Sequence, residues 1–150
     1  MRIDLLELNE TFARFAELHE QIQTYVVMTD SEDPKAGNRK YPLMWMQLTD
    51  DIVLDRNAAS LGLTFLFLDK VMPDDSNLLF VLNDCLNLVQ DFRDFFDENE
   101  EKFKFTIDTD ATATPILIDY DDRLAGYSLS VTLDIQSNRD ERVIPMQPWT

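Results

Sequence analysis

Apolar residues recur along the chain with two different spacings, and each spacing appears twice. Near the N-terminus most of them follow one another at steps of three or four, which is the spacing of one helix face. A second set with this spacing occupies the middle of the chain. The two sets are Leu5, Leu8, Phe12, Phe15, Ile22 and Val26, and then Leu78, Leu82, Cys85, Val89, Phe92 and Phe96. They predict a helix from about Asp4, its N-cap, to about Met28, and another from Asp75 or Ser76 to about Glu98.

After each helical set, apolar residues alternate with polar ones at every second position. Alternation of this kind is typical of a strand with one buried face. The clearest examples are Leu61, Leu63, Phe65 and Phe67, and then Tyr127, Leu129, Val131, Leu133 and Ile135. They predict strands over about 60–71 and 124–136, with further strands over 41–48, around 103–107 and over 116–120. The segment 50–58 remains open as a turn, a bulge or a strand continuation.

The order helix, strands, helix, strands predicts an α+β fold in which two helices pack on one side of an antiparallel sheet. A chain of 150 residues fits one domain. We assign residues 1–137 to this domain. Residues 138–150 form a C-terminal extension, because Pro145 and Pro148 interrupt any regular element there.

The strongly negative net charge of the chain excludes some classes of binding partner. The chain has 29 acidic and 13 basic residues and a formal net charge of -16. Such a field repels phosphate, which argues against a nucleic-acid reader and against an anionic membrane surface. The single cysteine excludes an intrachain disulfide, and the sequence has neither a signal core nor an apolar run of membrane-spanning length. We therefore expect a soluble protein that is made and assembled in the cytoplasm, with no membrane partner.

Residues that could carry chemistry have a structural interpretation here. His19 and Cys85 both fall on the apolar stripes of the helices, without further histidine or cysteine residues at ligand spacing, so packing in the core is favoured. Aspartate pairs occur at the expected turns, and the calcium-like start at Asp108 lacks the glycine and glutamate of a calcium loop. The sequence therefore predicts no catalytic residue, no cofactor, no metal site and no enzyme activity.

Positive charge gathers in one segment, at Lys35, Arg39 and Lys40. These residues could simply be solvated. Alternatively, they contact the acidic surface of a neighbouring subunit, because copies of a strongly negative protein associate only where opposite charges meet. Aromatic residues beside basic ones are typical of contact centres, and Trp149, flanked by Pro148 in a free tail, likewise suits a partner groove. The predicted partner interface is Lys35, Arg39, Lys40, Tyr41, Trp45, Pro148 and Trp149.

Several short motifs resemble a known family. They are the run from Leu79 through Phe96, Pro115, Asp122, Leu124-Ala125-Gly126-Tyr127 with the alternation from Ser128 to Ile135, Val143-Ile144-Pro145, and Tyr41-Pro42-Leu43. Together they are similar to virion neck and tail-completion proteins of long-tailed bacteriophages of Bacteroidota. The order of elements also resembles the tail-terminator fold, in which small α+β subunits form a hexameric ring that caps the tail tube.

The resemblance implies a structural virion protein without enzyme activity. It would be a homo-oligomer, a hexamer in the tail-terminator case, at the head-tail junction, where the ring ends tail-tube assembly and joins the tube to the connector. DNA would pass through an acidic channel without specific binding. Another hypothesis is an acidic cytoplasmic adaptor or inhibitor that binds a basic partner. A third is a metal-dependent hydrolase built on the aspartates.

Overall fold

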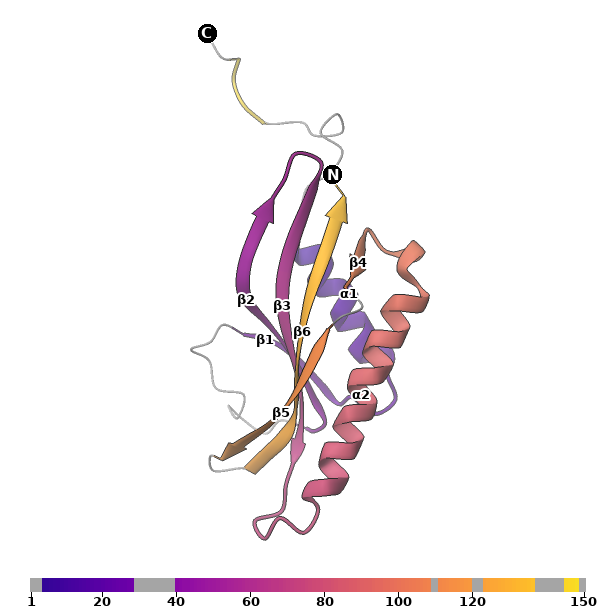
Figure 1. Cartoon of the computed structure of the whole chain (residues 1–150), viewed down its shortest axis with the longest axis vertical. Helices are drawn as coiled ribbons and strands as arrows, with labels where there is room; N and C mark the ends of the chain where they lie inside the picture. The colour runs from indigo at the N-terminus through magenta and orange to yellow at the C-terminus, as the bar shows by residue number, and fades with distance from the viewer. Residues whose placement is uncertain (1–3, 29–39, 109–110, 120–122, 137–144, 149–150) are drawn as a thin grey trace.

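The computed structural model describes residues 4–28, 40–108, 111–119, 123–136 and 145–148 and has the α+β architecture that the sequence predicts (Figure 1). Within these residues, six strands form one sheet, in the order β1-β2-β3-β6-β4, and β5 also pairs with β6. Two helices, α1 (Leu5–Leu18) and α2 (Leu78–Glu98), contribute to a shared core on one face of the sheet. The opposite face is not covered by a described helix, and it is the face turned to the viewer in Figure 1.

Helix α1 begins where the sequence predicts and ends ten residues earlier. The Asp4 carboxylate accepts hydrogen bonds from the amides of Leu6 and Glu7 at 3.0 and 3.1 Å, so the predicted N-cap is confirmed. The helix stops at Leu18 and strand β1 (Thr24–Met28) follows, so the prediction of a helix to Met28 is wrong. A run of threonine, tyrosine and two valines suits a strand, and the parallel ladder with the next strand decides between the two.

Three long strands form the centre of the sheet. They are β2 (Leu43–Leu54), β3 (Ala58–Lys70) and β6 (Arg123–Gln136). Strand β3 is antiparallel to both of its neighbours, and it pairs with β6 from Lys70↔Leu124 to Ala58↔Gln136. The free side of β6 pairs with β4 (Phe105–Ile107) at one end and with β5 (Thr112–Asp119) along the rest. The sheet is mixed, because β1 and β2 are parallel, and the expectation of a wholly antiparallel sheet is corrected on this point.

Helix α2 ends at Glu98 as predicted, but its N-cap is Asn77 and not Asp75 or Ser76, and a 3-10 turn, η1 (Glu100–Lys102), follows it. Aromatic rings from both helices meet over the sheet. Phe12 is fully buried, and its ring centroid lies 4.8 Å from that of Phe65 on β3 and 5.3 Å from that of Phe96 on α2. Edge-to-face and tilted contacts of this kind stabilise a core beyond the burial of apolar area. This aromatic cluster fixes both helices on the sheet.

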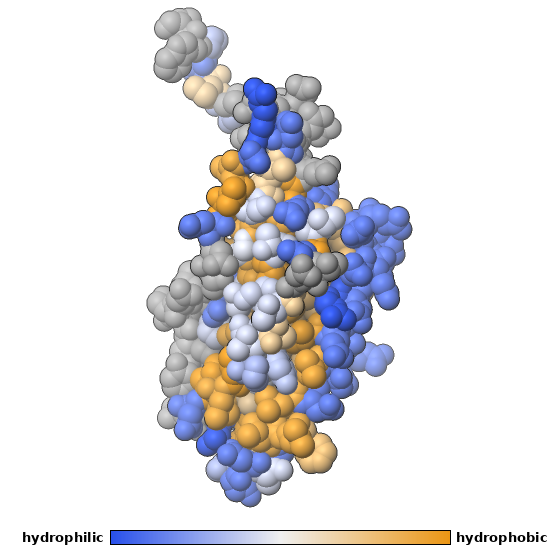
Figure 2. Space-filling model, in the orientation of Figure 1, coloured by the Kyte–Doolittle hydropathy of each residue, from blue (hydrophilic) through white to orange (hydrophobic). Residues whose placement is uncertain are grey.

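The uncovered face of the sheet has a small apolar cluster at one end and a polar middle. The cluster consists of Leu43, Trp45, Leu66, Leu68 and Leu124. Beyond it, hydroxyl side chains predominate, as the sequence alternation of β6 predicts, and Ser60 donates a hydrogen bond to Asp134 across the strands at 2.9 Å. Figure 2 shows pale residues over the middle of this face and orange, hydrophobic residues toward both ends of the molecule.

Candidate functional site

The first exposed apolar surface lies at the β2–β3 hairpin. Strand β1 pairs with β2 only over residues 43–47, so on that side β2 has no described neighbour beyond Gln47. The β2–β3 register then shifts between Leu48 and Ile52, which marks a bulge. Leu48, Ile52, Val53 and Leu54 are exposed along this unpaired edge, and we call them the hairpin surface. Exposed apolar strand edges can accept a further strand or a partner surface.

A second exposed apolar surface lies at the start of α2. Met72, Leu79 and Phe80 are 56%, 78% and 73% exposed, and we call these three residues the ridge. Figure 1 places the ridge end of α2 and the hairpin tip at opposite ends of the long axis of the molecule. Exposed large apolar side chains gathered in one short segment are typical of an interaction site.

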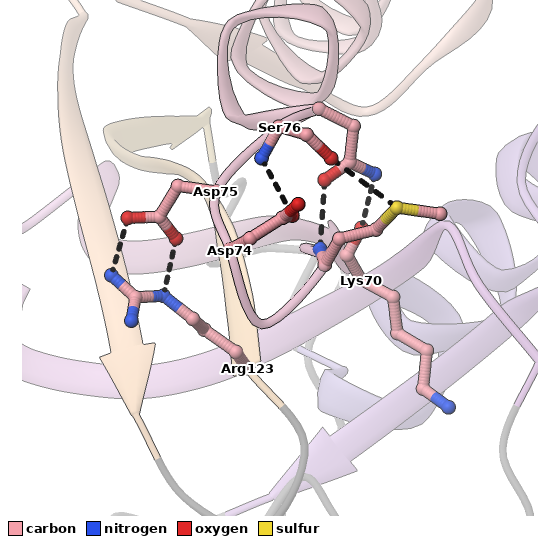
Figure 3. A network of polar contacts seen from close by, with 7 residues as sticks. Lys70, Asp74, Asp75, Ser76 and Arg123 are labelled. Carbon is pink, nitrogen blue, oxygen red and sulfur yellow. Dashed lines mark hydrogen bonds and ion pairs between the residues drawn. The ribbon is translucent and has the colours of Figure 1, made fainter.

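A polar network holds the loop that carries the ridge (Figure 3). The Asn77 side chain accepts a hydrogen bond from the Met72 amide at 2.7 Å and donates one to the Lys70 carbonyl at 3.3 Å. Asn77 is the N-cap residue, yet its side chain makes no capping bond to α2. The Asn77 side chain therefore stabilises the loop and is not available to cap the N-terminus of α2.

An ion pair between Asp75 and Arg123 completes this network. The carboxylate oxygens of Asp75 lie 3.0 and 3.1 Å from Nε and Nη2 of Arg123, which is the first residue of β6. Asp75 also has a φ of 61°, a left-handed conformation that is uncommon outside glycine. Nη2 of Arg123 donates a charge-assisted hydrogen bond to the carboxylate, whereas Nε lies within ion-pair distance without donating one. The ridge is thus presented by a loop with a defined geometry.

A groove opens between α1 and the C-terminal half of α2. It has a volume of about 330 Å³ and is lined by Phe15, Leu18, Phe95, Phe103, Thr11, Arg14 and His19. The lining is mostly apolar, as in sites that bind apolar groups. His19 is one of the lining residues, and its Nε2 lies 2.9 Å from Oδ2 of Asp91. Its Nδ1 accepts a hydrogen bond from the Gln21 amide at 3.1 Å. The acceptor role of Nδ1 places the ring proton on Nε2, which donates to Asp91.

The exposed side of α2 has an acidic stripe. Asp84, Asp91, Asp94 and Glu98 follow one another at steps of seven, three and four, so they lie along one side of the helix. The last turn has no basic residue, although the helix dipole favours cations there. Glu98 therefore lies at the end of the helix where the dipole disfavours a carboxylate, whereas Asp91 contacts His19 and Asp94 pairs with Arg93.

The residues of the predicted partner interface are in different environments. Lys40 and Pro148 are exposed, Tyr41 is half-buried, and the Thr24 hydroxyl donates to the Lys40 carbonyl at 2.7 Å. Trp45 is buried in the small cluster on the uncovered face, because strand alternation turns its side chain there, and it offers little surface to a partner. Lys35, Arg39 and Trp149 lie outside the described residues.

The candidate chemical residues are packed or belong to turns. Cys85 is fully buried, and burial raises the pKa of its thiol to about 12, so it fills the core as predicted. His19 is hydrogen-bonded as described above, although it follows α1 instead of lying within it. Among the described residues, no group of three or more histidine, cysteine or acidic side chains could hold a metal ion. In the same part of the chain, no helix is both long and apolar enough to cross a membrane.

Sequence reasoning missed the ridge, the hairpin surface and the groove. Leu79 and Phe80 fall beside the apolar stripe of α2, and this displacement was the available signal for exposed apolar residues. The groove depends on the distance between two helices, which no local pattern encodes. No family model matches the chain, and no curated protein is significantly similar to it.

Proposed function

We propose that this protein is a structural virion protein, a tail-terminator or neck subunit that forms an oligomeric ring at the head-tail junction. The ring ends tail-tube assembly on one side and joins the tube to the connector on the other. A hexamer is the form that the tail-terminator resemblance implies. The protein acts through docking and carries out no chemical reaction.

The observation that carries this proposal is the pair of unlike apolar surfaces at the two ends of the long axis. The hairpin surface lies on a strand edge, and the ridge lies on a loop at the start of α2. A ring subunit needs two different contact surfaces, one toward the next copy of itself and one toward a different virion protein. Both surfaces suit partners that exclude water from exposed leucine, isoleucine and phenylalanine side chains.

The acidic stripe on α2 supports the same role. In a ring, an acidic wall repels the phosphate backbone, so DNA passes without binding. Glu98 of the stripe and its neighbour Asp97, both in the last turn of α2, provide a test of this idea. Replacing both with lysine should stabilise the helix, by about 0.5 kcal/mol per residue at low salt, because cations then face the helix C-terminus. The same change should weaken the repulsion of DNA, which a titration with duplex DNA at low salt can measure against the original protein.

The decisive experiment measures mass and particle association. We expect the purified protein to sediment as a discrete oligomer, alone or with tail-tube protein, and to appear as rings in negative-stain electron microscopy. It should also co-sediment with tailed particles. A stable monomer that binds neither tube nor connector protein would refute the proposal.

The acidic stripe also favours a second candidate function, an adaptor or inhibitor that binds a basic partner. A row of carboxylates on one helix face complements a basic surface. Capture of basic host proteins at physiological salt by the original protein, and weaker capture by the Asp97→Lys, Glu98→Lys variant, would support this function. The ring protein should instead be recovered with particles.

A further inference from the structure

We infer that the ridge of one copy docks into the groove between α1 and α2 of a second copy, so that the contact joins unlike surfaces of identical chains. This inference rests on the proposed function for its setting in a ring. The contact itself follows from three features of the described residues: the shape and lining of the groove, the charge around each surface, and their separation along α2.

The groove suits apolar side chains of the size found on the ridge. Its base is made by Phe15 and Phe95, whose ring centroids lie 5.4 Å apart, and Leu18 extends it toward solvent with an exposed fraction of 68%. A volume of about 330 Å³ is at the lower end of the range for binding pockets, and it matches one aromatic and one aliphatic side chain. Leu79 and Phe80 are adjacent residues of these two kinds.

Charge complementarity points to a second copy as the occupant. Arg14 lines the groove and forms no ion pair with any other residue that the structure describes. Asp84 lies one helical turn after Phe80, on the same side of α2. Docking of the ridge brings Asp84 of one copy toward Arg14 of the other. In a protein with a net charge of -16, a contact between copies needs a cation of this kind at its centre.

The ridge cannot reach the groove of its own chain. Phe80 and Phe95 are 15 residues apart in one straight helix, which separates them by about 22 Å along the axis. The preorganised loop of Asn77 and Asp75 keeps the ridge in place, so no local rearrangement brings the two together. In the part of the chain that the structure describes, each copy therefore has one uncovered ridge and one uncovered groove. A contact between unlike surfaces repeats from copy to copy and closes into a ring when the rotation allows it.

The test uses one variant for each surface. Phe80→Glu removes the ridge contact and leaves the groove intact, whereas Leu18→Glu blocks the groove and leaves the ridge intact. Both positions are exposed, so both variants should fold, as circular dichroism can verify. By analytical ultracentrifugation we expect each variant alone to remain monomeric, with association weakened about 30-fold or more. An equimolar mixture should form a one-to-one dimer, because one intact ridge meets one intact groove.

Leu6→Glu is the matched control, since Leu6 is 75% exposed on α1 and does not line the groove. It should assemble like the original protein.

As a second test, Arg14→Asp should weaken assembly and Asp84→Arg should restore it in the double variant. If Phe80→Glu and Leu18→Glu still form the original oligomer, or if their mixture stays monomeric, the ridge-to-groove contact is refuted while a ring can stand. A monomeric original protein refutes this contact, and particle co-sedimentation then decides the proposed function separately.

Discussion

The two ends of the molecule expose similar apolar side chains on very different supports. At the ridge, Asn77 and the Asp75–Arg123 ion pair fix the loop in front of α2. At the hairpin surface, β2 is bulged, and beyond Gln47 it has a described neighbour on one side only. Exposed apolar side chains are thus held by a preorganised loop at the ridge and by a strand edge with no described neighbour at the hairpin surface.

This difference indicates two modes of binding. A preorganised surface loses little conformational freedom on docking and suits a contact repeated identically between copies. An unpaired strand edge can instead gain main-chain hydrogen bonds when a partner strand is added. We therefore assign the ridge to contacts between copies and the hairpin surface to a different protein.

Gly126→Ala should have the largest effect, because it damages the strand pair that connects the two ends. A Cβ at this position would lie 1.7 Å from the Phe67 carbonyl oxygen of β3, so the two backbones would have to move apart. We expect a loss of about 3 kcal/mol in the free energy of unfolding. Chemical denaturation measures this loss. Ser128→Ala, on the same strand, adds no atom and is the control, and an equal effect of both changes would contradict the steric explanation.

Asn77→Ala should affect one end only. The change leaves the Met72 amide and the Lys70 carbonyl without the hydrogen bonds that Asn77 provides, at a cost of about 2 kcal/mol. Hydrogen exchange should accelerate in the loop from Met72 to Phe80 and remain unchanged in the hairpin. Asn83→Ala, at an exposed position of α2, is the matched control. Faster exchange at both ends would show that the two ends are not independent.

Sequence patterns identified the helices and strands whose apolar residues keep one spacing over many residues. The stripe from Leu78 to Phe96 and the alternation from Tyr127 to Ile135 each extend over many residues and have one interpretation. Residues 22–26 have two interpretations, because positions four residues apart, such as Ile22 and Val26, share one face in a helix and also in a strand. The choice is made by parallel pairing with β2, which is a non-local interaction. The mixed sheet follows from that same pairing.

The ridge and the burial of Trp45 could not be predicted from the sequence, because they too depend on contacts between residues far apart in the chain. Exposure of Leu79 and Phe80 follows from the direction in which α2 leaves the loop, and Asp75 and Arg123 set this direction from positions 48 residues apart in the sequence. Trp45 was predicted as a contact residue because it follows a basic segment. Its burial depends on Leu66 and Leu68 of the neighbouring strand, which the sequence around Trp45 does not contain.

Leu54→Gln and Leu79→Gln form a matched pair with small effects on stability. Both leucines are strongly exposed, one at the hairpin surface and one on the ridge, so each change should alter the free energy of unfolding by about 0.5 kcal/mol or less. Leu79→Gln should weaken assembly of the purified protein in sedimentation experiments. Leu54→Gln should leave assembly intact and weaken binding of a tail-tube or connector protein, measured by biolayer interferometry. Equal effects of both variants on both measurements would remove the distinction between the ends.

Acid should loosen the ridge loop, with the smallest effect of the four. The Ser76 hydroxyl and then the Ser76 amide hold the pKa of Asp74 below its ordinary value of 3.8. Because the pKa is lower in the folded state, the contribution of Asp74 to loop order is complete above pH 3.8 and disappears as the pH falls through the lower folded value. The amide resonance of Ser76 in a nitrogen-edited nuclear magnetic resonance titration should shift in that acidic range. The Val53 amide of the hairpin surface has no carboxylate acceptor among the described residues and serves as the internal control. A Ser76 amide that does not respond down to pH 2 would mean that Asp74 does not support the ridge, which would then depend on Asn77 and the Asp75–Arg123 pair alone.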